Sequence, residues 1–251
     1  MVFNRVMPCL LLRGGALVKT VRFRAPAYVS DPVNAVKIFN EKEVDELVVL
    51  DIAAGERGPD VATLRAVASE CFMPLAAGGG VRSVADVEAL IALGVEKVIV
   101  NTLLRRAPAV VAEAVREFGS SSVVGSIDVR RGWRGALRVH AAGGGPAPRD
   151  ALAHARMAAE DVGVGEILLT SVDRDGTWAG YDLDAVRAVA AAVTVPIVAC
   201  GGAGAVADVR ALFETTPATG AAVGSLAVYQ KRGMGVLISF PSRAALLGPD
   251  S

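Results

Sequence analysis

Two glycine-rich clusters in the sequence have the spacing of phosphate-binding loops. The first is Gly78-Gly79-Gly80, with Asn101-Thr102 starting 23 residues after Gly78, and the second is Gly201-Gly202-Ala203-Gly204, with Gly224-Ser225 at the same interval. Glycine lets backbone N–H groups approach phosphate oxygens closely. Tight turns also use glycine, so a single cluster leaves both explanations open. Two clusters in matching positions favour a ligand with a phosphate at each end.

Three aspartates in the sequence could act in acid–base chemistry. Asp51 and Asp128 occur in apolar runs, and Asp175 lies in the segment Asp173-Arg-Asp-Gly-Thr, where Gly176 could also contact a ligand. Partial burial raises a carboxyl pKa toward neutrality, which suits a general acid or base. Asp is also frequent in turns, so a purely structural role stays open for each of them.

Four apolar runs begin with a charged residue, namely Arg5, Glu46, Lys97 and Glu166. Charged side chains are mostly exposed, so ordinary solvated strand starts would explain them. The other explanation is a salt-bridged ring that closes one end of the fold. The four charges of such a ring would sum to zero.

Short β-branched runs alternate with alanine-rich stretches along the whole chain. This alternation predicts parallel strands joined by crossover helices, and 251 residues suit one α/β domain of the (β/α)8 barrel type. We therefore predict a single barrel over residues 1–251. The predicted strands are 5–11, 46–51, 74–77, 97–100, 123–129, 166–170, 196–199 and 221–223, and the predicted helices include 32–40, 83–93, 109–118, 149–162, 183–192 and 205–213. Residues 141–148 are predicted to be a loop closing a hairpin between Trp133 and His140.

The chain also repeats itself, because the segment 73–90 matches the segment 195–212 after a shift of the glycines. A half-barrel internal duplication explains this match. When Val6 is aligned with Val123, Leu11 aligns with Asp128. Since active sites of these barrels lie at the carboxyl ends of the strands, both positions are expected there.

Bulk composition excludes several functions. Lys plus Arg and Asp plus Glu number 26 each, so no attraction to nucleic acid or to a membrane surface is expected. The uncharged stretch 188–207 is interrupted by Pro196 and glycines, which predicts barrel core and not a membrane span. Three cysteines without a CxxC pair and only two histidines predict reduced thiols, no metal and no cofactor. We expect a cytoplasmic protein.

From Arg5 to about Tyr229 the residues resemble the cyclase subunit of imidazole glycerol phosphate synthase. The resemblance rests on Asp45-Glu-Leu-Val-Val-Leu-Asp-Ile, Gly78-Gly-Gly, Gly165-Glu-Ile-Leu-Leu-Thr-Ser-Val-Asp-Arg-Asp-Gly-Thr and Gly201-Gly-Ala-Gly. It implies a glutaminase (HisH-like) partner at the foot of the barrel, an ammonia path through the core, and a phosphorylated small molecule at the top. It also implies that Arg5, Glu46, Lys97 and Glu166 form the ammonia gate. The positions that it assigns to ligand contact are Lys19, Asn101, Thr102, Thr170, Asp175, Gly202 and Ser225.

One departure from this family bears on the chemistry. The resemblance assigns the cyclase reaction to two aspartates, of which Asp128 is one, but the position of the other is occupied by Leu11. Leucine transfers no proton, and the loss of a general acid or base costs about 10²- to 10⁴-fold in rate. The segments around Lys19 and Glu70 resemble a branch of the family associated with glycosyl amidation in surface polysaccharide synthesis.

Three functions therefore stay open. The first, which Leu11 favours, is an ammonia-conducting subunit that serves a separate sugar amidotransferase. The second is a working cyclase of histidine biosynthesis. The third is a binding scaffold without ammonia transfer.

Overall fold

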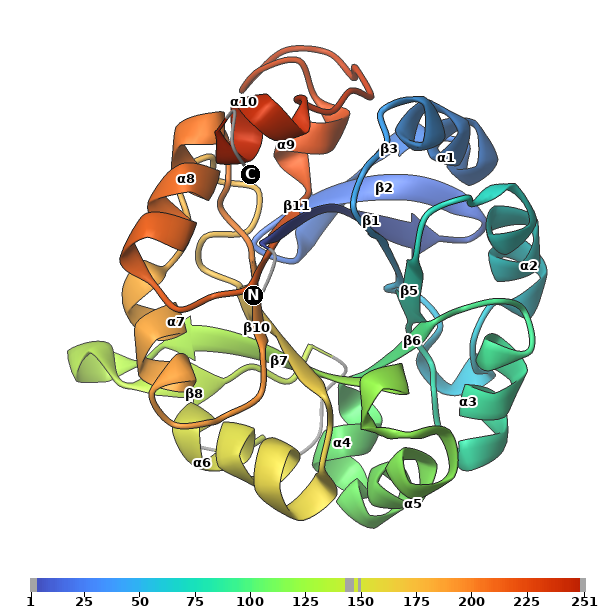
Figure 1. Ribbon diagram of the computed structural model, residues 1–251, viewed down its shortest axis with the longest axis vertical. Helices are drawn as coiled ribbons and strands as arrows, with labels where there is room; N and C mark the ends of the chain where they lie inside the picture. The colour runs from blue at the N-terminus through green and yellow to red at the C-terminus, as the bar shows by residue number, and fades with distance from the viewer. Residues whose placement is uncertain (1–3, 143–146, 149, 249–251) are drawn as a thin grey trace.

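A closed barrel of parallel strands forms the centre of the computed structural model, which describes residues 4–142, 147–148 and 150–248 (Figure 1). Each barrel strand pairs in parallel with the next, and the last pairs with the first, within these residues. In order around the barrel they are β1 (Arg5–Arg13), β4 (Leu47–Asp51), β5 (Leu75–Gly78), β6 (Lys97–Val100), β7 (Val123–Arg131), β9 (Glu166–Ser171), β10 (Ile197–Cys200) and β11 (Gly220–Val223). This arrangement confirms the predicted (β/α)8 fold, although most strands begin or end one or two residues from the predicted bounds.

Helices cover the outside of the barrel (Figure 1). The α-helices are α1 (Pro32–Glu41), α2 (Val61–Glu70), α3 (Val84–Ile91), α4 (Thr102–Arg106), α5 (Pro108–Phe118), α6 (Ala151–Arg156), α7 (Leu183–Ala190), α8 (Val206–Thr215), α9 (Ser225–Val228) and α10 (Arg243–Leu247). Short 3-10 turns are η1 (Gly55–Arg57), η2 (Ser120–Ser122) and η3 (Trp133–Gly135), and η4 (Met157–Val162) is π-helical. Side-chain caps set several helix starts, since Asp31 and Ser83 accept hydrogen bonds from Asn34 and Asp86.

Two hairpins at the upper end of the barrel were missed or misplaced by the sequence prediction. The strands β2 (Ala16–Val21) and β3 (Arg24–Ser30) follow β1 as an antiparallel ribbon that was not predicted. The strand β8 (Leu137–Val139) pairs with β7, so residues 132–136 close that hairpin and not 141–148. The error arose because β7 continues to Arg131 beyond its predicted end. Of the predicted loop 141–148 and helix 149–162, residues 143–146 and 149 lie outside the described residues.

The inside of the barrel is filled by side chains from alternate strand positions. Met7 and Cys9 of β1, Ile99 of β6 and Val124 of β7 belong to one buried cluster with five similar residues from the other strands. A separate, larger cluster packs the outer faces of the strands against the helices. Because side chains alternate along a strand, the interior cluster fixes which residues point into the barrel above and below it.

Candidate functional site

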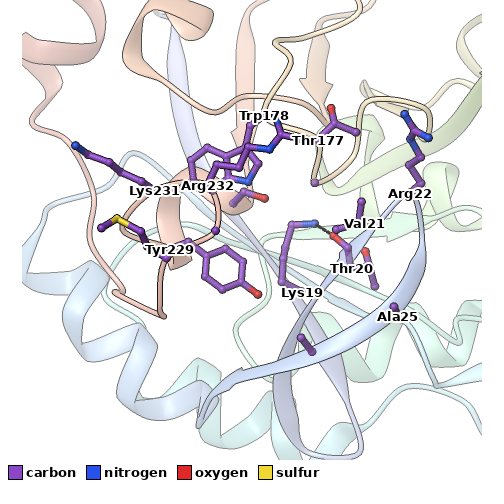
Figure 2. A pocket seen from close by; sticks show the side chains of 15 residues that line it. Lys19, Thr20, Val21, Arg22, Ala25, Thr177, Trp178, Tyr229, Lys231 and Arg232 are labelled. Carbon is purple, nitrogen blue, oxygen red and sulfur yellow. Dashed lines mark hydrogen bonds between the residues drawn. The ribbon is translucent and has the colours of Figure 1, made fainter.

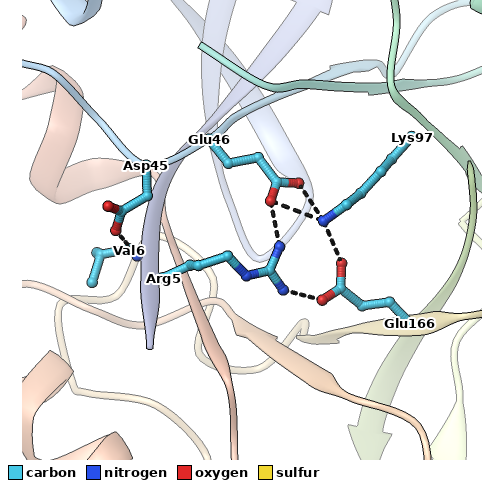
Figure 3. A network of polar contacts seen from close by, with 6 residues as sticks. All are labelled: Arg5, Val6, Asp45, Glu46, Lys97 and Glu166. Atoms are coloured by element: carbon cyan, nitrogen blue, oxygen red, sulfur yellow. Dashed lines mark hydrogen bonds and ion pairs between the residues drawn. The ribbon is translucent and has the colours of Figure 1, made fainter. Parts of the chain in front are cut away.

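A closed ring of charges lies at the lower end of the barrel interior, where the strands begin (Figure 3). We call this end the foot and these four residues, Arg5, Glu46, Lys97 and Glu166, the foot ring. Arg5 bonds both Glu46 and Glu166, and Lys97 Nζ lies 2.9 Å from Glu46 Oε2 and 3.1 Å from Glu166 Oε2. The side chains of Glu46 and Glu166 are only 4% and 9% exposed. The explanation as ordinary solvated strand starts is therefore wrong for the two acids.

Electrostatics hold the foot ring together. Burial alone would lower the pKa of Arg5, but Glu166 and Glu46 outweigh it and raise that pKa above its ordinary value. Two buried carboxylates are tolerated here because each contacts two cations. The ring therefore depends on all of its members, and removing one leaves buried charge without a partner.

Asp128 is the inward-facing acid at the upper end of the interior, which we call the mouth. It lies four residues beyond Val124 of the interior cluster, so strand alternation directs it inward. Its Oδ2 accepts a hydrogen bond of 2.9 Å from Asn101 Nδ2, and Thr170 is its neighbour in register on the adjacent strand β9. Burial raises the pKa of Asp128 to about 7, against the lowering effects of Asn101 and Arg105. Such a carboxyl group can both donate and accept a proton near neutral pH.

Leu11 faces the same space from the opposite side of the barrel. It lies two residues beyond Cys9 of the interior cluster, and its neighbour in register on β4, Leu50, packs against that cluster. Four parallel pairings separate β1 from β7 in either direction around the barrel, so Leu11 and Asp128 belong to opposite walls. At this level one wall of the mouth carries an acid and the other carries hydrocarbon.

A second carboxylate, Asp175, holds the β2–β3 hairpin over the mouth. Its Oδ1 lies 2.7 Å from Lys19 Nζ, and its Oδ2 accepts hydrogen bonds of 2.9 Å from Thr20 Oγ1 and 3.3 Å from the Phe23 N–H. The turn residues Arg22 and Phe23 have φ values of 51° and 61°, which are costly for non-glycine residues. The bonds to Asp175 offset that strain. Asp175 and Lys19 therefore form a buried ion pair that holds the β2–β3 hairpin in place.

The mouth holds a cavity of about 710 Å³, which we call the mouth cavity (Figure 2), and of the second glycine cluster and its Gly224-Ser225 pair only Ser225 lines it. We call Gly202, Gly204, Gly224 and Ser225 the second cup. Ser225, Lys19 and Gly176 line the cavity, and a Cβ on Gly224 would lie only 3.0 Å from Lys19 Cε. The lining also includes Thr20, Arg22, Trp178 and Tyr229, which the sequence analysis did not single out.

The first glycine cluster lies apart from that cavity. We call Gly79, Gly80, Asn101 and Thr102 the first cup, and none of these residues lines the mouth cavity. Gly79 has φ 107° and no room for a Cβ against the backbone of Asp51, so it serves a tight approach of two chain segments. Asp51 itself accepts a hydrogen bond of 2.8 Å from the Ala53 N–H, which is the turn role considered for it. Ligand contact by the residues of the two cups stays a prediction.

Residues 4–142, 147–148 and 150–248 contain neither a metal-binding cluster nor a membrane-spanning helix. No group of three or more His, Cys, Asp or Glu side chains there is arranged as metal ligands would be. In the same part of the chain, no helix has the length and hydrophobicity needed to span a bilayer.

Comparison with known proteins identifies the family. Residues 5–232 match the model of the family described as histidine biosynthesis protein. A Pseudomonas aeruginosa protein whose name includes imidazole glycerol phosphate synthase subunit hisF2 is 46% identical over 243 residues, 96% of this chain and 97% of the relative. The imidazole glycerol phosphate synthase subunit HisF of Streptococcus sanguinis is 41% identical over 232 residues, 91% and 92% of the two chains. The chain therefore belongs to the histidine biosynthesis protein family and is a HisF-like member of it.

Proposed function

We propose that this chain is the HisF-type subunit of an imidazole glycerol phosphate synthase complex. In this proposal a glutaminase subunit binds at the foot, and ammonia passes through the barrel to a phosphorylated substrate at the mouth. The names of the relatives support the choice of complex. The observation that carries the proposal is the foot ring, whose acids and bases alternate around the barrel and bond one another across its interior.

The physical properties of the interior are those that a path for neutral ammonia needs. Above the foot ring stand small and apolar side chains such as Ala76, Val48 and Ala222. An unpaired ammonium ion would pay a large desolvation cost among them, whereas NH3 would not. The foot ring is closed by its own ion pairs, so passage requires that one cation move away from its acids. Lys97 is the candidate, because its ammonium group sits on a flexible four-carbon chain, whereas the guanidinium group of Arg5 is planar and rigid.

At the mouth, Asp128 is proposed as the general acid–base group of ring closure. Its pKa of about 7 makes both protonation states available, and the Asn101 amide fixes the orientation of its carboxyl group. The second cup with Lys19, and the first cup with Thr170, are proposed to hold the two ends of the substrate. The inward position of Leu11 leaves this position on the opposite wall without a proton-transfer group.

Leu11 favours a second candidate function, in which the barrel delivers ammonia but closes no imidazole ring. The acceptor would then belong to a separate amidotransferase acting on a nucleotide sugar for surface polysaccharide synthesis. A conduit needs the foot ring and an open interior, whereas it does not need two acids at the mouth. The relatives' names favour the cyclase, and the side chain at position 11 favours the conduit.

One experiment separates these two candidates. The chain is mixed with its glutaminase partner, glutamine and the phosphoribulosyl substrate, and both glutamate and imidazole glycerol phosphate are measured. Formation of imidazole glycerol phosphate, both with glutamine and with ammonium salt alone, supports the cyclase. Glutamate formation that rises on mixing without imidazole product overturns the cyclase and supports the conduit. Failure of the barrel to change glutaminase turnover would contradict both.

A further inference from the structure

The mouth cavity is larger than a single phosphate requires. It lies between the β2–β3 hairpin and a second hairpin that is closed by the bridge between Tyr229 and Val236. Its volume of about 710 Å³ falls in the range that holds a whole organic ligand. The second cup occupies only one side of this space, through Ser225. Room for additional ligand atoms therefore remains beside the cup.

The charges around this space are not balanced within the protein. Lys19 is neutralised by Asp175 at 2.7 Å, whereas Arg22, Lys231 and Arg232 form no ion pair with any residue that the structure describes. Figure 2 shows Arg22 on one side of the cavity and Arg232 on the other, with Lys19 between them, while the Lys231 ammonium group points away. Arg22 Nε donates a hydrogen bond of 3.2 Å to the Asp173 carbonyl oxygen, and Arg22 and Arg232 both line the cavity, so two guanidinium groups flank the space above Lys19.

Aromatic side chains enclose the same space. The ring of Trp178 lines the cavity and packs against Gly204 of the second cup, since a Cβ on Gly204 would lie 2.8 Å from Trp178 Cε3. The Tyr229 hydroxyl points toward the Lys19 side of the cavity (Figure 2). Aromatic walls with a few converging polar groups are typical of sites for organic ligands and not of simple ion sites.

We propose that the mouth cavity contains a second anion subsite, in which Arg22 and Arg232 bind the outer phosphate of an organic diphosphate whose inner phosphate occupies the second cup. Guanidinium groups suit this task because they bind phosphate oxygens in pairs. The inference rests on the second cup of the proposed function, but it needs neither a glutaminase nor ammonia transfer. It differs from a ligand with one phosphate at each end, because the first cup does not line this cavity.

The test is calorimetric titration of the full chain with phosphate, AMP, pyrophosphate and ADP. ADP is expected to bind at least about tenfold more tightly than AMP, as for one added charge-assisted contact. Arg22→Ala and Arg232→Ala should each weaken ADP binding by about tenfold while changing phosphate binding less than about twofold. Arg65→Ala removes the same charge from an exposed position on α2 and should change neither.

A spectroscopic readout makes the location testable. The chain has two tryptophans, so Trp133→Phe leaves Trp178 as the only one. ADP should change the fluorescence of this variant, and Arg232→Ala in the same background should shift the midpoint to higher concentration. If Trp178 fluorescence does not respond while calorimetry records ADP binding, the ligand is elsewhere and the inference is wrong.

The remaining outcomes separate this inference from the proposed function. Phosphate binding without any preference for ADP over AMP would retain the second cup and overturn the subsite. A preference for ADP that survives both arginine substitutions would also overturn it. If none of the probes binds, the subsite and the phosphate role of the second cup are both wrong, although ammonia passage through the foot could still be measured.

Discussion

At the foot, two acids and two bases neutralise one another across the barrel, whereas at the mouth Asp128 faces a wall on which Leu11 supplies only hydrocarbon. The foot ring is stable because every carboxylate has two cationic partners. Asp128 is hydrogen-bonded to Asn101 and Thr170, and burial raises its pKa to about 7. The comparison teaches that a buried acid stays charged where cations surround it in a closed network, whereas an acid buried without a directly bonded cation has its pKa raised toward neutrality.

The strongest way to break this comparison is to remove the acid at the mouth. Asp128→Asn keeps the shape and the contact with Asn101 but transfers no proton. Turnover of the phosphoribulosyl substrate should fall by about 10²- to 10⁴-fold, with ammonium salt as much as with glutamine. Equal rates for Asp128→Asn and the unmodified chain in a steady-state assay would show that Asp128 transfers no proton in the reaction.

Opening the foot should lower the turnover that depends on glutamine without changing the turnover with ammonium salt. Lys97→Met leaves Glu46 and Glu166 with Arg5 as their remaining cation in the foot ring. Without the bonds of Lys97 the foot stays open and ammonia leaks into solution, so glutamine-dependent turnover should fall by about 10- to 100-fold, the factor that corresponds to about 1.5–3 kcal/mol. Turnover with ammonium salt should be unchanged, since that ammonia can enter at the mouth. Lys37→Met is the matched control, because Lys37 is 55% exposed and 3.7 Å from Glu70. A loss in both assays would mean that the foot ring is only structural.

Releasing the hairpin should have a smaller effect. Asp175→Asn removes the charge that pairs with Lys19 and weakens the bonds to Thr20 and Phe23. We expect about 1–3 kcal/mol less stability, measured by urea unfolding, because Lys19 is left buried without its partner. Asp184→Asn, at a position with 77% of its side chain exposed, should cost little. Equal stabilities of the two variants would show that the pairing of Asp175 with Lys19 contributes nothing.

The raised pKa of Asp128 also predicts how stability depends on pH. The pKa of the Asp128 carboxyl is 3.8 in the unfolded chain and about 7 in the folded one, so between these values the folded state binds the extra proton. The contribution of Asp128 to the free energy of unfolding should therefore be largest at low pH, decrease as pH rises toward 7, and stay constant above it. Asp128→Asn should remove this slope when the two chains are compared across the pH range. A difference between the two that does not vary with pH would contradict the raised pKa.

The smallest effect on the proposed reaction is expected from Leu11→Asp. If the chain already works as a cyclase, another arrangement supplies the second proton transfer, and a new acid should change turnover by less than about tenfold. A large gain of imidazole product from an inactive parent chain would instead support the conduit. Leu11→Asn is the control for polarity without a titratable proton.

Much of the architecture could be predicted because it depends on patterns of residues that are close together in the sequence. Apolar runs after charged residues such as Lys97 and Glu166 marked the barrel strands, and the matching glycine clusters marked the mouth. The internal repeat also placed Leu11 and Asp128 at equivalent points of the two halves. These features depend on neighbours in sequence, or on a repeat, and need no knowledge of distant contacts.

The contacts between distant segments could not be predicted in the same way. The β2–β3 hairpin has non-glycine residues at its turn, and its conformation depends on Asp175, which lies 152 residues beyond Phe23. The sequence also did not decide whether the four charged side chains at the foot pair with one another or are solvated, because spacing does not reveal which side chains converge. The mouth cavity was missed because Arg22, Trp178 and Tyr229 come from three separate loops.

The proposal that ammonia travels from foot to mouth is tested most directly by competition in solution. The complex with its glutaminase partner makes product from glutamine while an enzyme that consumes free ammonia is added in excess. The account predicts that product formation by the unmodified chain is unaffected, because the ammonia never enters bulk solution, and that the remaining product of Lys97→Met is lost. If the scavenger abolishes product formation by the unmodified chain, ammonia does not pass through the barrel.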